Sequence, residues 1–231
     1  MRLSISGRHG IKKMSKYLNV LVLFRNNEEL VGPYFYFLRR NTTRNLRVIA
    51  LDNGSNDKTY KRLKDHKLPQ DIILQVPKNV GTSKGRNIIL REIWKQEGGY
   101  CDILCTDSDM FFTRESSIEA MTRMHSDMVF GMTHSISGRI EANGGIWCAL
   151  YKKKVWEIVK EFDEKFYNYY DDTDLFVRAI KAGLKHLKCP NAHCLHVWGS
   201  TNTIGSETET RMEDLAKDKA IMVKKWGESY A

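Results

Sequence analysis

The first half of the chain contains short, continuous apolar runs, and a cluster of polar residues follows each run. Strands that are buried on both faces of a sheet have this pattern, because neither side of the strand meets water. Each run has the length of one strand. The predicted strands cover residues 19–24, 46–51, 71–76 and 101–106.

Helix signals separate these runs. Polar residues 26–29 favour a helix start after the first run, and Asn56 with Asp57 can cap a helix after the second. A further helix is expected over residues 82–96. Strands and helices that alternate in this way predict a parallel sheet with helices on both faces.

The composition is that of a globular protein. The chain has 231 residues, of which 42% are hydrophobic, and this is enough for one domain with a sizeable core. No apolar stretch is long enough to span a membrane, and the N-terminus lacks the apolar centre of a secretory signal, so a cytoplasmic protein is expected. Five cysteines without regular spacing indicate reduced, partly buried thiols.

Acidic residues lie at the ends of two predicted strands. Asp52 ends the second strand, and Asp107 and Asp109 follow the fourth. The carboxyl ends of parallel strands form a ligand-binding crevice, so these acids are expected to share one site. Oxygen ligands at this spacing suit Mg²⁺ or Mn²⁺, with phosphate oxygens completing the shell. The alternative is that Asp107 caps a turn before Phe111 enters the core.

Six segments together resemble a GT-A fold glycosyltransferase of the family 2 type, over residues 19 to 200. The segments, in order, are LDNGSNDKT (51–59), NVGTSKGRN (79–87), TDSDM (106–110), GGIWCALYKK (144–153), DDTDLFVRAIKAG (171–183) and HVWGST (196–201). The resemblance implies an α/β, GT-A (Rossmann-like) single domain with a mostly parallel central sheet flanked by helices. It also implies transfer of a sugar from a nucleotide diphosphate, usually UDP, with inversion at the anomeric carbon.

The resemblance further implies a set of donor-binding residues. Asp52 can accept a hydrogen bond from the imide N–H of a base such as uracil. Arg86 has two alternatives, contact with the diphosphate or an ion pair with a nearby carboxylate. Gly81 suits a sharp turn or a close approach to a ligand, or an ordinary junction between loop and helix. The predicted donor-binding residues are Asn26, Asp52, Asn53, Ser55, Asn79, Gly81, Arg86 and Asp107.

By the same resemblance, Asp109 and His196 would bind the catalytic Mn²⁺ or Mg²⁺. The alternative for His196 is a histidine buried in the core with its hydrogen bonds satisfied. A zinc site in residues 189–196 is not expected, because the spacing of its cysteines and histidines differs from the usual ligand pairs. The predicted acceptor-binding residues are Gly144, Gly145, Trp147 and Asp171.

Asp172 is the predicted general base. A helix is expected to begin near Thr173, with Asp171 and Asp172 at its N-terminus. Asp174 lies four residues before Arg178, a spacing that favours a structural ion pair on one helix face. Asp172 is then left to take the acceptor proton. The alternative is that Asp172 only caps the helix.

These assignments divide the chain into an N-terminal extension (1–18), a GT-A domain (19–205) and a C-terminal amphipathic helix (206–231). Within the domain, residues 19–113 would bind the nucleotide sugar and residues 114–205 the acceptor. In the last helix, an apolar stripe is expected to pack on the domain or on a partner; it consists of Met212, Leu215, Met222 and Trp226.

The net charge of +9 suggests a polyanionic acceptor, such as lipopolysaccharide, teichoic acid or modified DNA. It is also compatible with peripheral contact with a membrane. Two other functions are open at this stage. A sugar-nucleotide pyrophosphorylase would use a similar crevice, but its early glycine-rich signature is missing before Asp52. A nucleic-acid-binding module without catalysis would explain the charge but not the acidic strand ends.

Overall fold

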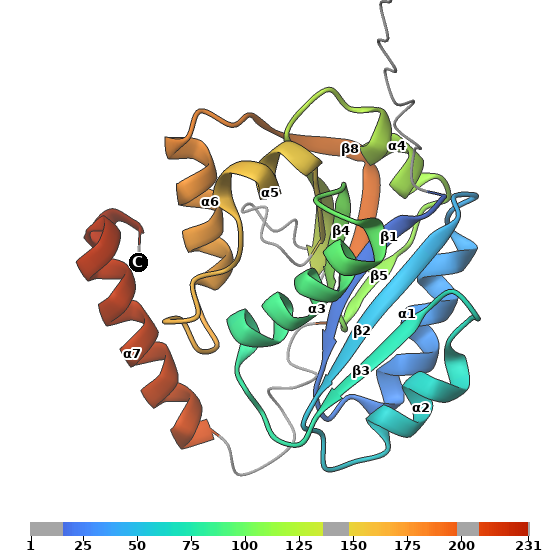
Figure 1. Ribbon diagram of the computed structural model, residues 1–231, viewed down its shortest axis with the longest axis horizontal. Coiled ribbons are helices and arrows are strands. Elements are labelled where there is room, and N and C mark those ends of the chain that lie inside the picture. The colour runs from blue at the N-terminus through green and yellow to red at the C-terminus, as the bar shows by residue number, and fades with distance from the viewer. Residues whose placement is uncertain (1–15, 136–147, 198–207, 231) are drawn as a thin grey trace, which may run out of the picture.

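The computed structural model describes residues 16–135, 148–197 and 208–230, and these form an α/β domain around one sheet (Figure 1). The sheet has eight strands in the order β3-β2-β1-β4-β7-β6-β8-β5. The strands are β1 (Leu18–Phe24), β2 (Leu46–Asn53), β3 (Ile72–Val76), β4 (Ile103–Asp107), β5 (Met110–Phe112), β6 (Met128–Ser135), β7 (Cys148–Tyr151) and β8 (His186–His196).

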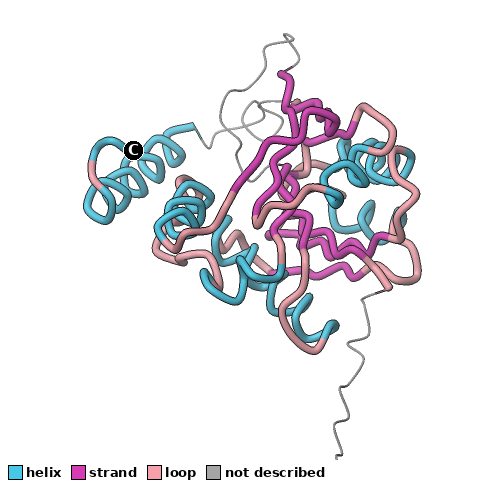
Figure 2. The backbone as a smooth tube through the Cα atoms, turned by 90° about the horizontal axis from the view of Figure 1, so that it is seen from above, coloured by secondary structure: helices cyan, strands magenta, loops and turns pink. Residues whose placement is uncertain are grey.

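The sheet is mixed, and its two halves differ. Strands β3, β2, β1 and β4 are all parallel, as the alternating pattern predicts. The second half contains the antiparallel pairs β4–β7, β6–β7 and β5–β8, together with one parallel pair, β6–β8. The sheet is strongly curled, as the view from above shows (Figure 2).

Helices cover both faces of the sheet. The helices in the described ranges are α1 (Glu28–Arg40), α2 (Thr59–His66), α3 (Thr82–Glu97), α4 (Ser117–Arg123), α5 (Lys153–Val159), α6 (Asp171–Lys181) and α7 (Thr208–Trp226), with a 3-10 turn at Glu228–Tyr230. Helices α1 and α2 lie on one side of the strands and α3 on the other (Figure 1).

The alternation of side chains along β1 explains this arrangement. Val20 and Val22 point into a core layer that contains Tyr34 and Phe35 of α1. Leu21, between them, points to the opposite layer, to which α3, α5 and α6 contribute. Because successive strand residues face opposite sides, a strand that is apolar throughout needs helices on both faces.

The predicted elements match the structure closely, with shifts at their ends. The strand expected at residue 71 begins at Ile72, and α3 extends one residue beyond the expected end, to Glu97. The helix expected near Thr173 begins at Asp171. Its structural ion pair is confirmed, with Arg178 Nε and Asp174 Oδ2 2.7 Å apart. All five cysteines are free thiols, as expected.

Helix α7 lies at the periphery, beside α6 (Figure 1). Met222 is fully buried against Phe166 and Val177 in a small core of its own. Met212 is 64% exposed, so this residue of the expected apolar stripe does not pack on the domain, and its packing on a partner stays a prediction. The packed face of the helix instead includes Asp218, which is buried.

Candidate active site

Strand register brings the first acids of the site to one edge of the sheet. Asp52 pairs with Phe24 of β1, and Asp107 pairs with Leu23 of the same strand. The two acids therefore lie on either side of the end of β1. This is the edge where the sequence predicts a ligand crevice.

Hydrogen bonds join the loop after β1 to the loop after β2. The N–H of Asn26 donates to Ser55 Oγ at 2.9 Å, and the N–H of Asn56 donates to Asn26 Oδ1 at 2.9 Å. Asn26 has a φ of 50°, a left-handed conformation that asparagine tolerates better than most residues. Its side chain and backbone thus fix the position of Ser55, and both residues stay predicted donor contacts.

Asp52 and Asn53 are buried and bonded within the protein. Asp52 accepts hydrogen bonds from Gln75 Nε2 at 3.0 Å and from the N–H of Ser55 at 3.2 Å. Asn53 Nδ2 donates to Asn79 Oδ1 at 2.9 Å. Asn53 and Asn79 therefore act together to shape the loop before α3, and their contact with the donor stays a prediction.

Gly81 is needed for close packing at the start of α3. Its φ is +85°, and a Cβ at this position would lie 2.5 Å from the carbonyl oxygen of Tyr167. A side chain cannot be accommodated there without a backbone shift. Gly85 is needed for a different contact, because a Cβ at this position would lie 2.8 Å from Leu23 Cδ1. It lets α3 approach the sheet.

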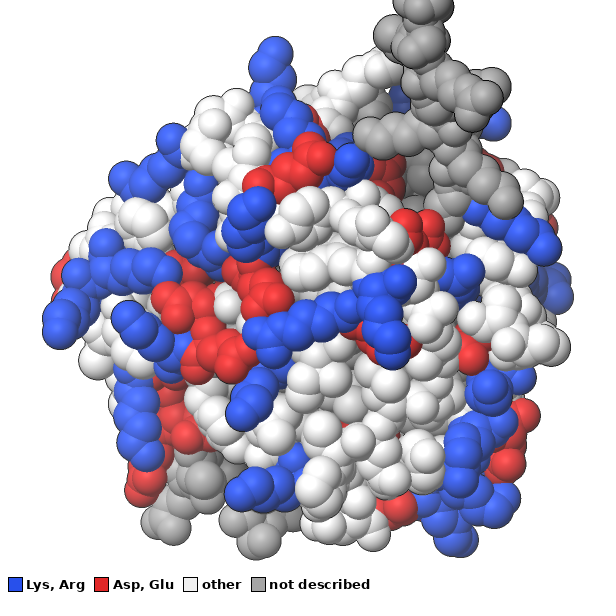
Figure 3. Space-filling model, viewed as in Figure 1, with Lys and Arg blue, Asp and Glu red and all other residues white. Residues whose placement is uncertain are grey.

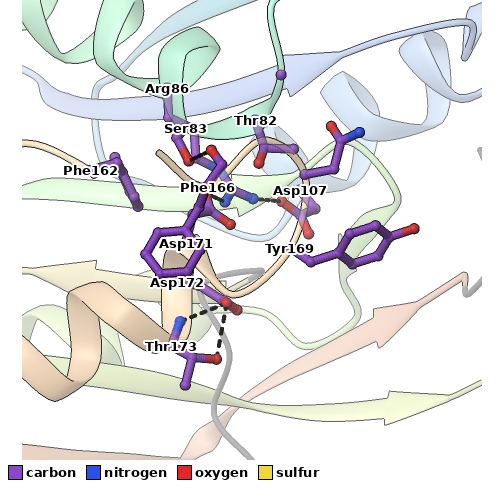
Figure 4. A network of polar contacts seen from close by, with 12 residues as sticks. Thr82, Ser83, Arg86, Asp107, Phe162, Phe166, Tyr169, Asp171, Asp172 and Thr173 are labelled. Atoms are coloured by element: carbon purple, nitrogen blue, oxygen red, sulfur yellow. Dashed lines mark hydrogen bonds and ion pairs between the residues drawn. The ribbon is translucent and has the colours of Figure 1, made fainter. Parts of the chain in front are cut away.

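Arg86 links the two halves of the site (Figure 4). Its guanidinium forms an ion pair with Asp107, with Nη2 and Oδ1 3.0 Å apart, and a second, shorter one with Asp171. The side chain of Arg86 is only 8% exposed and that of Asp171 only 4%. Of the two alternatives for Arg86, the ion pair with a carboxylate is confirmed. Contact with the diphosphate stays a prediction.

One guanidinium cannot fully neutralise this group of acids. Burial raises the pKa of Asp171 to about 6, although Arg86 opposes the shift. Burial likewise raises the pKa of Asp107, and the nearby carboxylate of Asp109 adds to the effect. For Arg86, attraction to Asp171 and Asp107 outweighs the effect of burial and raises its pKa. The site therefore has an excess of negative charge that favours a bound cation.

Asp172 lies next to this ion pair but does not join it. Its Oδ1 accepts from the N–H of Thr173 at 2.7 Å and from Thr173 Oγ1 at 3.3 Å. Among the described residues, Oδ2 of Asp172 has no hydrogen-bond partner, and the residue is half-buried. One oxygen thus contacts the helix N-terminus, and the other makes no hydrogen bond to the described residues.

Asp171, in contrast, forms an ion pair with Arg86. Acceptor contact by Asp171 stays a prediction, and the geometry gives this residue a structural task as well. The other predicted acceptor-binding residues, Gly144, Gly145 and Trp147, lie outside the described residues.

Asp109 and His196 are brought together by the pairing of β5 with β8. Nε2 of His196 lies 3.5 Å from Oδ1 of Asp109, and both residues are largely buried. The N–H of Val197 donates to the carbonyl oxygen of Asp109 at 3.0 Å, which fixes the backbone. Within the described ranges, no group of three or more His, Cys, Asp or Glu residues forms a complete metal site. A carboxylate oxygen and an imidazole nitrogen at the edge of an acidic site nevertheless fit Mn²⁺.

Sequence reasoning missed two features of the site. The side-chain amide of Asn27 and the hydroxyl of Ser108 are 2.7 Å apart, which joins the loop after β1 to the segment of Asp107 and Asp109. The second is the loop at residues 166–169, which packs on the start of α3. Ser108, a polar residue between Asp107 and Asp109, was the sequence signal for the first feature. No local pattern indicated the second.

The fold is of the GT-A type found in glycosyltransferases. Two solved structures illustrate the fold. The crystal structure of S. aureus TarS 1-349 matches with a TM-score of 0.61 at 17% identity, covering 90% of this chain and 72% of that one. The mannosyltransferase PcManGT from Pyrobaculum calidifontis, in complex with GDP-Man and Mn2+, matches with a TM-score of 0.66 at 14% identity, covering 92% of this chain and 66% of that one.

The model of the family described as Glycosyl transferase family 2 matches residues 19–179, and the chain belongs to this family. A structure of S. aureus TarS 1-349 in complex with UDP also matches, with a TM-score of 0.59 at 18% identity, covering 90% of this chain and 65% of that one. Among curated protein sequences, none matches the chain. In the described part of the chain, no helix combines the length and apolarity needed to cross a bilayer.

Proposed function

We propose that this glycosyltransferase moves a hexosyl or pentosyl group from a UDP-sugar to an acceptor nucleophile, with inversion at the anomeric carbon. The observation that carries the proposal is the position of Asp172. Its Oδ2 has no hydrogen-bond partner among the described residues, and Arg86 ties its neighbour Asp171 to Asp107 at the donor edge. These contacts support one site that would contain both the proposed base and the donor edge.

In the proposed reaction, Asp172 takes the proton from the acceptor hydroxyl. The acceptor oxygen forms a bond to the anomeric carbon on one face, while the bond to the diphosphate oxygen breaks on the other. The nucleoside diphosphate leaves with the electron pair. Such a single displacement needs one base on the acceptor side, and general bases typically contribute a factor of about 10² to 10⁴ in rate.

The donor would be held by the loops at the strand ends. In this proposal Asp52 would accept from the imide of the base. The loops that contain Asn26, Asn53, Ser55, Asn79 and Gly81, which are bonded to one another, would surround the ribose and the diphosphate. The UDP complex of S. aureus TarS 1-349 is consistent with this choice of nucleotide, because the two folds are alike.

Asp109 and His196 would hold Mn²⁺ or Mg²⁺. When bound, such a metal acts as a Lewis acid toward the leaving diphosphate. The support is the pair's own chemistry, an oxygen and a nitrogen donor 3.5 Å apart in a site with excess negative charge. The Mn2+ in the complex of the mannosyltransferase PcManGT, which has a similar fold, is in line with this proposal.

The proposed acceptor is a polyanion, because the chain carries a net charge of +9. The basic residues do not form one continuous block on the face drawn in Figure 3, where acidic side chains lie between them. A negatively charged acceptor would therefore meet separate groups of basic residues. Its binding would depend on salt less steeply than binding of a nucleic acid along a basic groove.

The experiment is a panel of labelled nucleotide sugars with lipopolysaccharide, teichoic acid, modified DNA and a neutral acceptor, at several salt concentrations. We expect transfer from a UDP-sugar, an inverted anomeric configuration in the product by NMR, and loss of transfer to the anionic acceptor as salt increases. Transfer that is best with a neutral acceptor and unaffected by salt would refute the polyanion proposal. No transfer from any nucleotide sugar would refute the proposed function.

A further inference from the structure

Asp218, in the middle of α7, is a buried carboxylate outside the site described above. It is 1% exposed, and it accepts hydrogen bonds from the backbone N–H groups of three successive residues. These are Tyr167, at 3.0 and 3.1 Å, Asn168, at 2.8 Å, and Tyr169, at 2.9 Å. Three amides around one carboxylate hold a loop firmly, because hydrogen bonds to a charged group are stronger than neutral ones.

The same loop is bonded to the start of α3 through its carbonyl groups. The N–H of Thr82 donates to the carbonyl oxygen of Tyr167 at 2.6 Å, and Ser83 Oγ donates to that of Phe166 at 2.5 Å. Arg86 follows one turn later on α3. The amides of residues 167–169 thus face α7, while the carbonyls of Phe166 and Tyr167 face the helix that carries Arg86.

The loop leads directly into the predicted catalytic acids. Tyr170 has a φ of 60°, a left-handed conformation that is unfavourable for a tyrosine, and its carbonyl accepts from the N–H of Asp174 at 2.8 Å. Asp171 and Asp172 follow at once. A residue held in such a conformation keeps it only when its surroundings impose it. Here the three amides bound by Asp218 immediately precede it.

The rest of α7 is anchored to the same region. Met222 packs against Phe166 and Val177, and Trp226 Nε1 donates to Asp174 Oδ1 at 2.8 Å. These contacts fix where α7 lies, so that Asp218 is presented to the loop in one position.

We propose that Asp218 is a positioning residue for sugar transfer. By binding the amides of residues 167–169, it fixes the direction of Asp172, and with it the alignment of Asp171 on Arg86. The inference rests on the proposed function, because it takes Asp172 to be the base. It assigns to α7 a part in the reaction, although no residue of this helix belongs to the predicted site.

The test compares two identical substitutions one turn apart. Asp218→Asn removes the charge that holds the loop. Asp214→Asn, the matched control, affects only the hydrogen bond from Asn168 Nδ2 to Asp214 Oδ2, which is 2.9 Å long. Asp218→Glu, which keeps the charge but moves it by one methylene, provides a milder variant if Asp218→Asn does not fold. For each protein, we would measure hydrogen exchange over residues 166–174, the Kd of UDP with Mn²⁺, and kcat and KM for the substrates found in the panel.

We expect Asp218→Asn to exchange faster over residues 166–174 and to lose kcat by about 10- to 100-fold, the scale of a misplaced catalytic group. The Kd of UDP should stay within about twofold, and Asp218→Glu should fall between Asp218→Asn and the wild type. Asp214→Asn should resemble the wild type in all measurements. A merely structural role would instead lower kcat and UDP binding together, in proportion to the folded fraction.

This design distinguishes failure of the proposed function from failure of the positioning role of Asp218. A wild-type protein that is folded but transfers no sugar overturns the proposed function, whatever the variants do. An active wild type with unchanged kcat in Asp218→Asn overturns the positioning role, and so does unchanged exchange over residues 166–174.

Discussion

Arg86 and Asp171 form a buried ion pair between two helices whose residues lie 85 positions apart in the chain. Arg86 comes from the first turns of α3, on the donor side, and Asp171 is the first residue of α6, on the proposed acceptor side. Since Arg86 also contacts Asp107, a single side chain links both sides of the site.

Replacing Arg86 by methionine should destabilise the fold strongly. Asp171, which is buried, and Asp107, whose side chain is 30% exposed, would lose their shared cation. Breaking a buried pair in this way costs about 3 to 5 kcal/mol. The measurement is urea unfolding at pH 7.5. Arg91→Met is the control, because Arg91 lies on the same helix and pairs with Glu161 while its own side chain is 54% exposed. An exposed pair contributes about 1 kcal/mol or less. Equal losses in both variants would contradict the prediction.

The stability of the protein should depend on pH through Asp171. The folded pKa of about 6 lies above the ordinary value of 3.8, so the folded state keeps a proton that the unfolded chain releases between these values. The free energy of unfolding should therefore fall as pH rises from about 4 to about 6, by about 1 to 3 kcal/mol.

The measurement is a series of urea unfolding curves between pH 4 and pH 7 for the wild type and Asp171→Asn. Asparagine does not titrate, so the fall across this window should be smaller in the variant. Parallel curves for the two proteins would show that Asp171 does not cause the effect.

Asp172→Asn should lower kcat by about 10² or more, because a general base is lost. The amide oxygen can still accept from the N–H of Thr173, so the melting temperature should barely change. Asp174→Asn is the contrast. It weakens the buried ion pairs with Arg178 and Lys225 and should reduce stability more than turnover. If Asp172 is only a cap, its variant would instead lose about 1 kcal/mol of stability and keep nearly normal turnover at low temperature.

His196→Ala should abolish the dependence of UDP binding on metal. In the wild type, calorimetry should give much tighter binding of UDP with Mn²⁺ than with a chelator, because the metal would bridge the protein and the diphosphate. Asp109→Ala should behave like His196→Ala while staying folded. His193→Ala is the control, because His193 lies on the same strand but its ring contacts His134, with the nitrogens 3.2 Å apart. Equal UDP affinity with and without metal in the wild type would refute the metal assignment.

Much of this protein is determined by local sequence. The apolar runs predicted β1, β2 and β4, because a strand buried on both faces can hardly carry polar residues. They also predicted β3, an edge strand that is only partly buried. The acids Asp52 and Asp107 were placed at one edge, since parallel strands share the direction of their carboxyl ends. The pair of Asp174 and Arg178 was also predictable, because its members are one helical turn apart.

Only the tertiary structure decided which charged groups meet. The sequence left Arg86 two alternatives, and its pairing with Asp171 required α3 and α6 to be brought together. The role of Asp218 was hidden for the same reason, because its amide partners at residues 167–169 lie about fifty positions away in the chain. Local patterns report propensity and burial, which depend on near neighbours. The partners of a buried charge depend on how distant segments pack, and no short stretch of sequence carries that information.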